Sequence, residues 1–343
     1  MNFKAREKFI KKNLNYSESY LTLCKEDIYY LSGFHGSFSL LLISNKKSFL
    51  FVDGRYYEKA KKLSNINEII LFTDLWKELK TIINTLKIKK IIFDGDSITY
   101  NFYKKLSQEL SSVELVTDDK KMIKKMREIK DEDEIKVIRK AVSKSLKAYE
   151  DFFERYRLVN LSEIECVNYL EFNLKKYGEG ISFETLILSG SNSSIPHGTP
   201  SKRIIEWGDT VIIDFGLKYK QYCTDHTRTW LLRNHKMEKY LQIVQLAFQE
   251  GLNKIRDGKE IKEVDIAIRN VFEKNNVLSN FLHSSGHGIG LSVHESPTIS
   301  YKTEGVFKEG MIVTLEPGLY FEGIGGIRHE EMILVTKNGC EIL

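Results

Sequence analysis

The stretch TVIIDFGLKYKQYCTDHTRTW, residues 210–230, decides the fold of the second half of this chain. It predicts two strands joined by a short turn near Tyr219 and Lys220. If Asp214 pairs with Asp225, the two carboxylates face the same side, with Cβ atoms about 5 Å apart. Aspartate is disfavoured in strands, and Asp214 directly follows the β-branched run at 211–213. The pair therefore indicates a cation site more strongly than two solvent-facing residues.

Further acidic and imidazole side chains lie next to glycines, Pro-Gly or apolar runs, which restrict their positions. His287 lies in GHGIG, where the flanking glycines let backbone or a ligand approach closely. Glu316 ends the apolar run MIVTL and precedes Pro-Gly, so it is either a ligand or a costly unpaired charge. Glu330 and Glu331 precede another apolar run, MILVT. Charge alone leaves both of them open as the last ligand.

These residues form a hard, oxygen-rich donor set of four carboxylates and one imidazole. Such a set favours Mn²⁺, Co²⁺ or Fe²⁺ and permits Zn²⁺, whereas structural zinc prefers thiolates. Four negative charges balance two divalent cations. Two ions roughly 3.5–4 Å apart activate water at neutral pH and polarise a carbonyl. The sequence therefore predicts a two-metal site, with Mn²⁺ as the preferred ion, that hydrolyses an amide or an ester.

Length and composition are those of an ordinary globular chain with two domains. The 343 residues exceed one ordinary core. Hydrophobic residues make up 42% and charged residues 29%, and the net charge of +5 is spread along the chain. The basic residues are not concentrated on one face, so nucleic-acid binding is not predicted. The densest basic run, residues 120–130, is interpreted as the solvated start of a helix, followed by the acidic stretch 131–134.

The expected location of the protein is the cytoplasm. The N-terminal sequence MNFKAREKFIKK is charged throughout, unlike a signal peptide. The longest apolar runs are far too short to span a bilayer, so no membrane association is expected. Four cysteines stand far apart with no C-x-x-C pair. Unpaired thiols in a reducing compartment are therefore expected.

Alternation of short apolar runs with polar periodic stretches predicts an α/β domain up to about residue 120. In it we expect strands at 27–31, 39–44, 48–52, 68–72 and 90–93, and helices at 55–63, 76–86 and 100–110. After it we expect helices at 131–156, 162–177, 237–255 and 261–275, with strand-like runs between the later ones. We therefore divide the chain into domains at 1–122 and 123–343.

The order of the candidate ligands resembles that of the pita-bread metallopeptidases, the group of methionine aminopeptidase, aminopeptidase P and prolidase. Their series is D-x10-D, then His, Glu and Glu, with GHGIG around the histidine and R-x-E near the end. All five positions match here. The resemblance implies that Asp225 and Glu330 bridge two metal ions. It also implies that His287 and Glu316 complete one ion and that Asp214 holds the other.

Other segments are typical of the Xaa-Pro-cleaving branch of that group. They include His283, four residues before the histidine ligand, and Arg328, two residues before Glu330. YLSGFHGS at 30–37 and FVDGRYYEKA at 51–60 look like the N-terminal domain of bacterial aminopeptidase P-like proteins. The implied architecture is an N-terminal creatinase-like α/β domain followed by a C-terminal pita-bread catalytic domain. A homodimer, with the first domain reaching the partner's site, is also implied.

Three positions depart from the family's usual pattern. Gln221 stands where the family usually has glycine before the tyrosine, which affects the turn geometry. His226 is unusual between Asp225 and the following threonine, and we interpret it as a strand residue that faces away from the metals. Glu331 replaces the usual aspartate. Alignment of R-H-E-E with the family's R-x-E-D selects Glu330 over Glu331 as the ligand.

The reaction that the resemblance implies is removal of the N-terminal residue from peptides with proline in the second position. It proceeds by metal-hydroxide attack on the carbonyl before proline. The proline nitrogen has no N–H and must gain a proton, which a histidine supplies near neutral pH. His197, in IPHGTP, and His294 are the residues expected to contact the scissile amide. Glu316 is expected to accept a proton from the nucleophile.

His283 and Arg328 are expected to line the proline side and to steady the ligands. Each also has a plainer interpretation, a structural hydrogen bond for His283 and a supporting salt bridge for Arg328. Alternatives to the aminopeptidase remain open. They are an Xaa-Pro dipeptidase (prolidase), a metal-free amidohydrolase of the creatinase branch, and a non-catalytic binding module on the same fold. The intact ligand set favours a peptidase over the last two.

Overall fold

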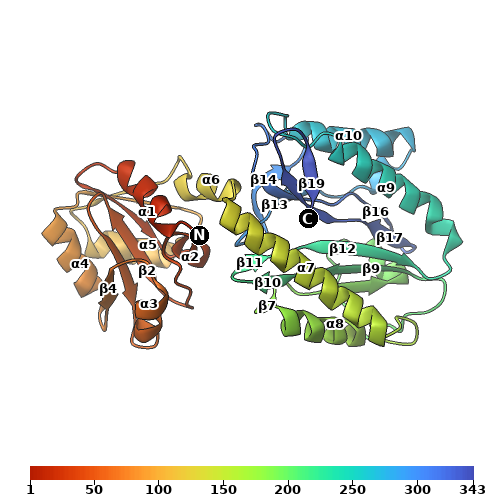
Figure 1. The fold of residues 1–343 in the computed structure, drawn as a ribbon, viewed down its shortest axis with the longest axis horizontal. Coiled ribbons are helices and arrows are strands. Elements are labelled where there is room, and N and C mark those ends of the chain that lie inside the picture. Colours follow the sequence, from red (N-terminus) through yellow and green to blue (C-terminus); the bar gives the residue numbers. More distant parts are fainter. The chain divides into compact units, whose positions relative to one another are not determined.

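The computed structural model describes residues 1–343, and the chain divides into two compact units, Met1–Arg127 and Glu128–Leu343. The expected division at 122/123 coincides with the start of helix α6 (Met122–Glu128). The division of the structure coincides with the end of that helix. Figure 1 shows both units and labels many of their elements.

The N-terminal unit is built around one mixed six-stranded sheet with the order β4-β3-β2-β1-β5-β6. Its strands are β1 (Glu18–Thr22), β2 (Leu40–Ser44), β3 (Ser48–Val52), β4 (Glu68–Leu71), β5 (Lys90–Phe93) and β6 (Glu114–Thr117). Its helices are α1 (Phe3–Lys12), α2 (Lys25–Ser32), α3 (Tyr57–Leu63), α4 (Leu75–Leu86) and α5 (Tyr100–Glu109). β1, β5 and β6 run parallel, and α5 connects β5 to β6.

The α/β character of this unit is confirmed, but one element has the wrong type. The strand expected at 27–31 lies inside α2. Ile28 and Leu31 are both buried, and their spacing is that of one face of a helix. Asp27, in the first turn, is buried in an ion pair with Arg127. A run this short carries no periodicity that separates strand from helix, and α1, β1 and β6 were not predicted at all.

Buried residues in the basic run at 120–130 contradict its interpretation as a solvated helix start. The run forms the separate helix α6, and the backbone of Ile129 then pairs with that of Met311. Arg127 and Lys130 are buried. Within the C-terminal unit, Lys130 Nζ lies 3.4 Å from a carboxylate oxygen of Glu295. Because a buried charge needs a partner, these two basic residues have structural roles.

Four helices of the C-terminal unit lie within three residues of their expected ends: α7 (Glu132–Arg155), α8 (Glu163–Tyr177), α9 (Glu238–Leu252) and α10 (Lys262–Lys274). Both α7 and α8 start with a complete capping box. In α8 the Ser162 hydroxyl accepts the backbone N–H of Glu165, whose side chain accepts that of Ser162. These reciprocal bonds satisfy N–H groups that a helix end otherwise leaves unpaired.

The strands of this unit form four small sheets rather than one large one. Their orders are β11-β10-β7, β12-β9-β8, β14-β13-β15-β18-β19 and β16-β17. The first two contain β7 (Gly180–Ile181), β8 (Leu186–Ser189), β9 (Thr210–Phe215), β10 (Leu217–Tyr219), β11 (Tyr222–Cys223) and β12 (His226–Leu231). The others contain β13 (Gly286–Gly288), β14 (Glu295–Ile299), β15 (Ile312–Leu315), β16 (Gly318–Phe321), β17 (Gly325–Arg328), β18 (Glu331–Val335) and β19 (Cys340–Ile342).

Each helix pair covers one side of these sheets (Figure 1). α7 and α8 pack on β8 and β9 through a core that includes Phe152, Leu170 and Ile213. α9 and α10 pack on β15 and β18 through a second core that includes Ile268 and Ile333. The strands that carry the candidate ligands lie between these two cores, so both helix pairs hold them in place.

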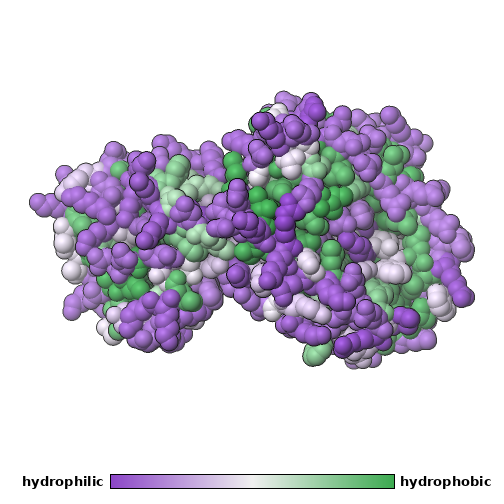
Figure 2. Space-filling view, in the orientation of Figure 1, coloured by the Kyte–Doolittle hydropathy of each residue, from purple (hydrophilic) through white to green (hydrophobic).

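The hydropathy of the surface and the state of the cysteines agree with the amino-acid composition. Hydrophilic residues cover most of the visible face of each unit (Figure 2). None of the helices combines the length and the apolar character that crossing a bilayer requires. All four cysteines are unpaired, as expected from their spacing.

Candidate metal centre

Asp214 and Asp225 face the same side, but their strand register differs from the expected one. Thr227, not Asp225, lies opposite Asp214 in the β9–β12 pair. Asp225 precedes β12 by one position and lies two residues from Thr227. Because side chains alternate along a strand, a shift of two residues changes the partner and keeps the face. The two carboxylates are therefore diagonal neighbours on one side of the sheet.

The shift arises because the turn lies one residue later than the expected position near Tyr219 and Lys220. β10 and β11 pair, with Tyr219 opposite Tyr222, so Lys220 and Gln221 form a two-residue turn. Both turn residues have positive φ, 49° and 68°, the pattern of a type I′ turn. This explains the family's usual glycine at 221, because glycine adopts such angles without strain. In this chain the Gln221 side chain instead donates to Glu179.

His287 is held on β13 by two close backbone contacts. A Cβ at Gly286 would lie 2.1 Å from the carbonyl oxygen of Thr314, and one at Gly288 would lie 2.2 Å from that of Ser296. The imidazole Nδ1 lies 3.0 Å from the carbonyl oxygen of Gly288. A carbonyl only accepts, so Nδ1 carries the proton and Nε2 keeps its lone pair. Nε2 is thereby left as the ligand atom.

That lone pair faces the carboxylates. His287 Nε2 lies 3.7 Å from an oxygen of Asp225 and 3.6 Å from one of Glu316. Burial lowers the pKa of His287 to about 4, so the ring is neutral at neutral pH. A neutral imidazole with its other nitrogen fixed by a carbonyl is the usual arrangement of a histidine metal ligand.

The structure also separates the two adjacent glutamates. Glu330 is buried and accepts a 2.7 Å hydrogen bond from the Thr227 hydroxyl. Glu331 points to the other face, where it pairs with Arg228 at 2.8 Å and lies 3.6 Å from Nδ1 of His226. His226 is fully buried on that face, away from Asp225 and Glu330. The alternation of β18 and β12 therefore sends Glu330 into the cluster and Glu331 out of it.

The cluster carries more negative charge than the protein itself neutralises. Oxygen or nitrogen ligand atoms of Asp225, His287 and Glu330 all lie within 4.8 Å of one another. Burial raises the pKa of Asp225 and of Glu330, and neighbouring carboxylates raise both further. Burial raises the pKa of Glu316 to about 8, although Arg328 opposes the change. Carboxylates in this state need protons or cations to neutralise them.

One buried oxygen of the cluster has no hydrogen-bond partner. Oδ2 of Asp214 accepts a 2.6 Å hydrogen bond from Arg328, whereas Oδ1 is buried without any. Buried polar atoms without a partner are rare and costly. Together with the hard donor set, this atom fits a divalent cation. The five expected ligands are therefore brought together in a setting that suits such ions.

Arg328 connects the cluster to Tyr320, a residue that the sequence pattern did not predict. Besides Asp214, the Arg328 guanidinium donates to the Thr227 hydroxyl at 3.0 Å and to the Tyr320 hydroxyl at 2.9 Å. Burial raises the pKa of Tyr320 to about 12, so its hydroxyl keeps its proton. The only sequence signal for Tyr320 is its place in the apolar segment just after Glu316-Pro-Gly. A buried aromatic residue in an apolar strand is common and indicates no particular role.

His283 lies at the end of this hydrogen-bond chain. Its Nδ1 donates to the carbonyl oxygen of Ser284 at 2.7 Å, and its Nε2 accepts from the Tyr320 hydroxyl at 2.9 Å. Burial lowers its pKa to about 4. Both ring nitrogens are therefore engaged within the protein. This geometry favours the structural interpretation of His283 over a direct role in proton transfer.

His197 and His294 differ from His283 because both are exposed. The ring of His294 stands edge-on to that of His287, with centroids 4.4 Å apart. His197 lies close enough to His283 to help lower its pKa. These two imidazoles border the cluster where a solvent-delivered molecule has access to them.

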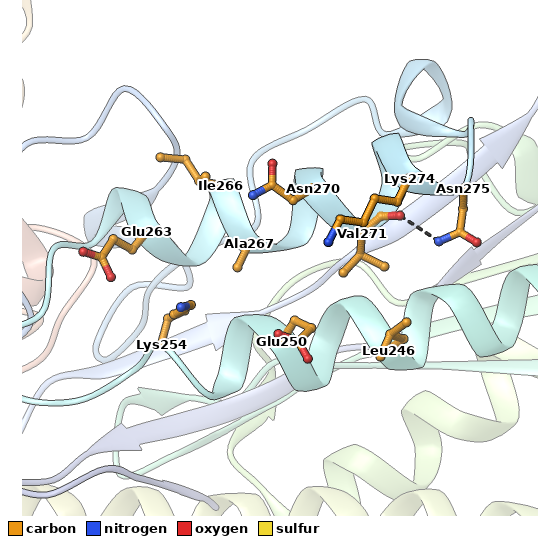
Figure 3. A pocket seen from close by; sticks show the side chains of 10 residues that line it. All are labelled: Leu246, Glu250, Lys254, Glu263, Ile266, Ala267, Asn270, Val271, Lys274 and Asn275. Atoms are coloured by element: carbon orange, nitrogen blue, oxygen red, sulfur yellow. Dashed lines mark hydrogen bonds between the residues drawn. The ribbon is translucent and has the colours of Figure 1, made fainter.

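A separate groove of about 420 Å³ lies between α9 and α10. Charged side chains of both signs face it, among them Glu250 and Lys274 (Figure 3). No predicted site residue lines this groove, so the chemistry assigned to the carboxylate cluster does not extend to it.

Comparison with known proteins gives two family matches that together span most of the chain. Residues 136–337 match Metallopeptidase family M24, and residues 9–129 match the Creatinase/Prolidase N-terminal domain. A protein named Xaa-Pro dipeptidase from Pyrococcus horikoshii is 35% identical over 349 residues, covering 100% of this chain and 97% of its own.

Two solved structures are similar over nearly their whole length. An Xaa-Pro dipeptidase from Bacillus anthracis has a TM-score of 0.92 and 34% identity, with 99% of this chain and 97% of that chain covered. An X-Pro aminopeptidase from Thermotoga maritima has a TM-score of 0.89 and 33% identity, with 97% and 96% covered. The relatives thus include both kinds of exopeptidase.

Proposed function

The chain belongs to metallopeptidase family M24, and from that premise we propose that it is an Xaa-Pro aminopeptidase. It removes the N-terminal residue from peptides that carry proline in the second position. The observation that carries the proposal is the cluster of four carboxylates and one neutral imidazole, with two exposed histidines at its border. Its relatives named as Xaa-Pro peptidases support the substrate class.

The residues proposed to hold two divalent ions are Asp214, Asp225, His287, Glu316 and Glu330. The unpartnered oxygen of Asp214 and the excess of carboxylates over guanidinium groups support this assignment. Oxygen-rich sites of this kind suit Mn²⁺. Such ions supply Lewis-acid polarisation of the scissile carbonyl and an activated water at neutral pH.

The protein's own residues hold and move protons around that centre. Glu316 lies 3.6 Å from Nε2 of His287, at the proposed metal centre, so we assign it the proton released by the attacking water. His197 and His294 are exposed, and one of them protonates the proline nitrogen, which has no N–H of its own. Because an imidazole exchanges protons near neutral pH, either ring suits this step.

Arg328, Tyr320 and His283 are positioning residues. Arg328 orients the carboxylate of Asp214 through a 2.6 Å hydrogen bond. The Tyr320 hydroxyl accepts from the same guanidinium and donates to His283. Such outer residues keep ligands in a productive geometry, and their loss commonly weakens metal binding or activity about 10- to 100-fold.

The alternative substrate is the free Xaa-Pro dipeptide, which the relatives named dipeptidases favour. A dipeptidase must recognise the carboxylate directly after proline, whereas an aminopeptidase must leave that end open. Hydrolysis of Xaa-Pro and Xaa-Pro-Yaa by the Mn²⁺-loaded protein tests the proposal. Faster release of Xaa from the tripeptide supports the aminopeptidase. Hydrolysis of the dipeptide alone overturns it in favour of prolidase.

Assembly and location are also proposed. A homodimer is expected from the family resemblance and is measurable by sedimentation. Cytoplasmic residence is proposed because four unpaired thiols suit a reducing compartment. A monomer in solution, at concentrations where the enzyme is active, would contradict the proposed homodimer.

A further inference from the structure

The loop that carries His197 is closed at both ends by one buried carboxylate. Glu163, the first residue of α8, is fully buried. Its Oε1 accepts from the backbone N–H of Ser189 at 2.7 Å and from the Ser189 hydroxyl at 2.8 Å. Its Oε2 accepts from the backbone N–H of Ser201 at 2.9 Å and from the Ser201 hydroxyl at 2.8 Å. One side chain thus joins the two residues that flank the segment 190–200.

The same carboxylate also contacts the interior of the loop. Nδ2 of Asn192 lies 3.2 Å from each oxygen of Glu163. The Ser189 hydroxyl accepts from Arg203 at 2.7 Å, and Arg203 in turn forms a two-point ion pair with Asp209. No basic side chain bonds to Glu163 directly, so neutral donors and the start of α8 stabilise its charge.

The loop needs such an anchor because the imidazole of His197 has none of its own. The ring is exposed, and no hydrogen bond, ion pair or ring contact holds it. Its position therefore depends on the backbone around it. On the far side from Glu163, the carbonyl oxygen of Pro196 accepts from Arg328 at 3.4 Å, and the Ser193 hydroxyl accepts from the backbone N–H of Gly326. The loop is thus held between Glu163 and the strand that carries Arg328.

From this geometry we propose that Glu163 is a positioning residue for catalysis, which sets the place of His197 by clamping Ser189 to Ser201. The inference rests on the proposed function, in which His197 contacts the scissile amide. A displacement of about 1 Å at a reacting group lowers rates by as much as about 100-fold. Loss of the clamp should therefore act on the chemical step rather than on metal binding.

The test is a double-mutant cycle with Glu163→Gln and His197→Ala in the Mn²⁺-loaded protein. The amide keeps the shape of Glu163 but replaces one acceptor oxygen with a donor that faces N–H and O–H groups. We expect Glu163→Gln to lower kcat on an Xaa-Pro-Yaa peptide about 10- to 100-fold, with metal content unchanged and KM altered less than kcat. In the His197→Ala background the same change should have little further effect.

A matched control is Ser162→Ala, which removes the N-cap hydroxyl of the same helix and leaves every donor to Glu163 in place. It should retain nearly the wild-type kcat. Ser201→Ala, which removes one of the donors, should lower kcat in the same direction as Glu163→Gln but less, and it serves if Glu163→Gln does not fold.

Two sets of outcomes separate this inference from the proposed function. If His197→Ala lowers kcat and this loss adds fully to that of Glu163→Gln, the role of Glu163 is overturned and the proposed function stands. The same conclusion would follow from a kcat loss in Ser162→Ala as large as that in Glu163→Gln, or from a parallel loss of metal. A His197→Ala variant with wild-type kcat would overturn the role of His197 in the proposed function as well.

Discussion

The stability of the metal-free protein should fall as the pH rises from 6.5 to 8. Burial raises the pKa of Glu316 from 4.5 to about 8, so the folded state binds a proton that the unfolded state has released. A raised folded-state pKa gives stability that is complete below the unfolded value and is lost as pH rises through the folded value. The loss is about 1.4 kcal/mol per pH unit for each such proton.

The pH window matters because buried histidines act in the opposite direction. Burial lowers the pKa of His283 and His287 from 6.5 to about 4, so their contribution grows between pH 4 and 6.5 and is constant above it. From pH 6.5 to 8 the carboxylates act alone. Glu316 then removes about 2 kcal/mol, and Asp225 and Glu330, whose pKa values are also raised, add to this loss.

The assay is urea unfolding in EDTA, followed by tryptophan fluorescence. Trp76 lies in the N-terminal unit and the other two tryptophans lie in the C-terminal unit, so a Trp76→Phe background reports on the latter. Saturating Mn²⁺ should flatten or reverse the pH dependence, because the cations replace the protons. Glu316→Gln should reduce the slope by about 1.4 kcal/mol per pH unit. A metal-free unit that is equally stable at pH 6.5 and 8, or a slope unchanged in Glu316→Gln, would refute the reasoning.

Three further predictions test the geometry of the centre, two of them with a matched control substitution. Arg328→Lys loses the planar fork that bonds several groups at once, so kcat or bound metal should fall about 10- to 100-fold, measured by steady-state kinetics and elemental analysis. Glu330→Gln should lose bound metal and at least about 99% of activity. The control Glu331→Gln should keep its metal stoichiometry. Equal losses in both variants would contradict the assignment of the two side chains to opposite faces. Gly288→Ala places a Cβ 2.2 Å from a carbonyl oxygen and should destabilise by about 3 kcal/mol, while Gly339→Ala, with open space around it, should change the melting temperature little.

Periodicity in the sequence was enough for the long helices of the C-terminal unit. The capping box at Ser162 and the apolar spacing of α7 are local signals, and local hydrogen bonds realise them directly. The segment at 27–31 shows the limit of such signals. Its strand-like composition is outweighed by a helical face buried against the rest of the N-terminal unit, and by the ion pair of Asp27 with Arg127, a residue distant in sequence.

The candidate ligands were predictable from the sequence because metal chemistry restricts residue type, and the surrounding glycines and apolar runs restrict position. Their supporting residues were not. Tyr320 has no chemical restriction of that kind, and Glu163 reads as an ordinary capping-region glutamate. Their roles follow from contacts with Arg328, Ser189 and Ser201, which the chain brings together only on folding.

The sequence by itself determined the family and the two-domain order, and it predicted the five acidic and imidazole residues that the fold brings together. Only the tertiary structure decided that Thr227 rather than Asp225 lies opposite Asp214, and that both nitrogens of His283 are bound within the protein. The physical reason is that local propensity fixes which residues form a strand. Register and hydrogen-bond partners depend instead on contacts between strands that meet from distant parts of the chain.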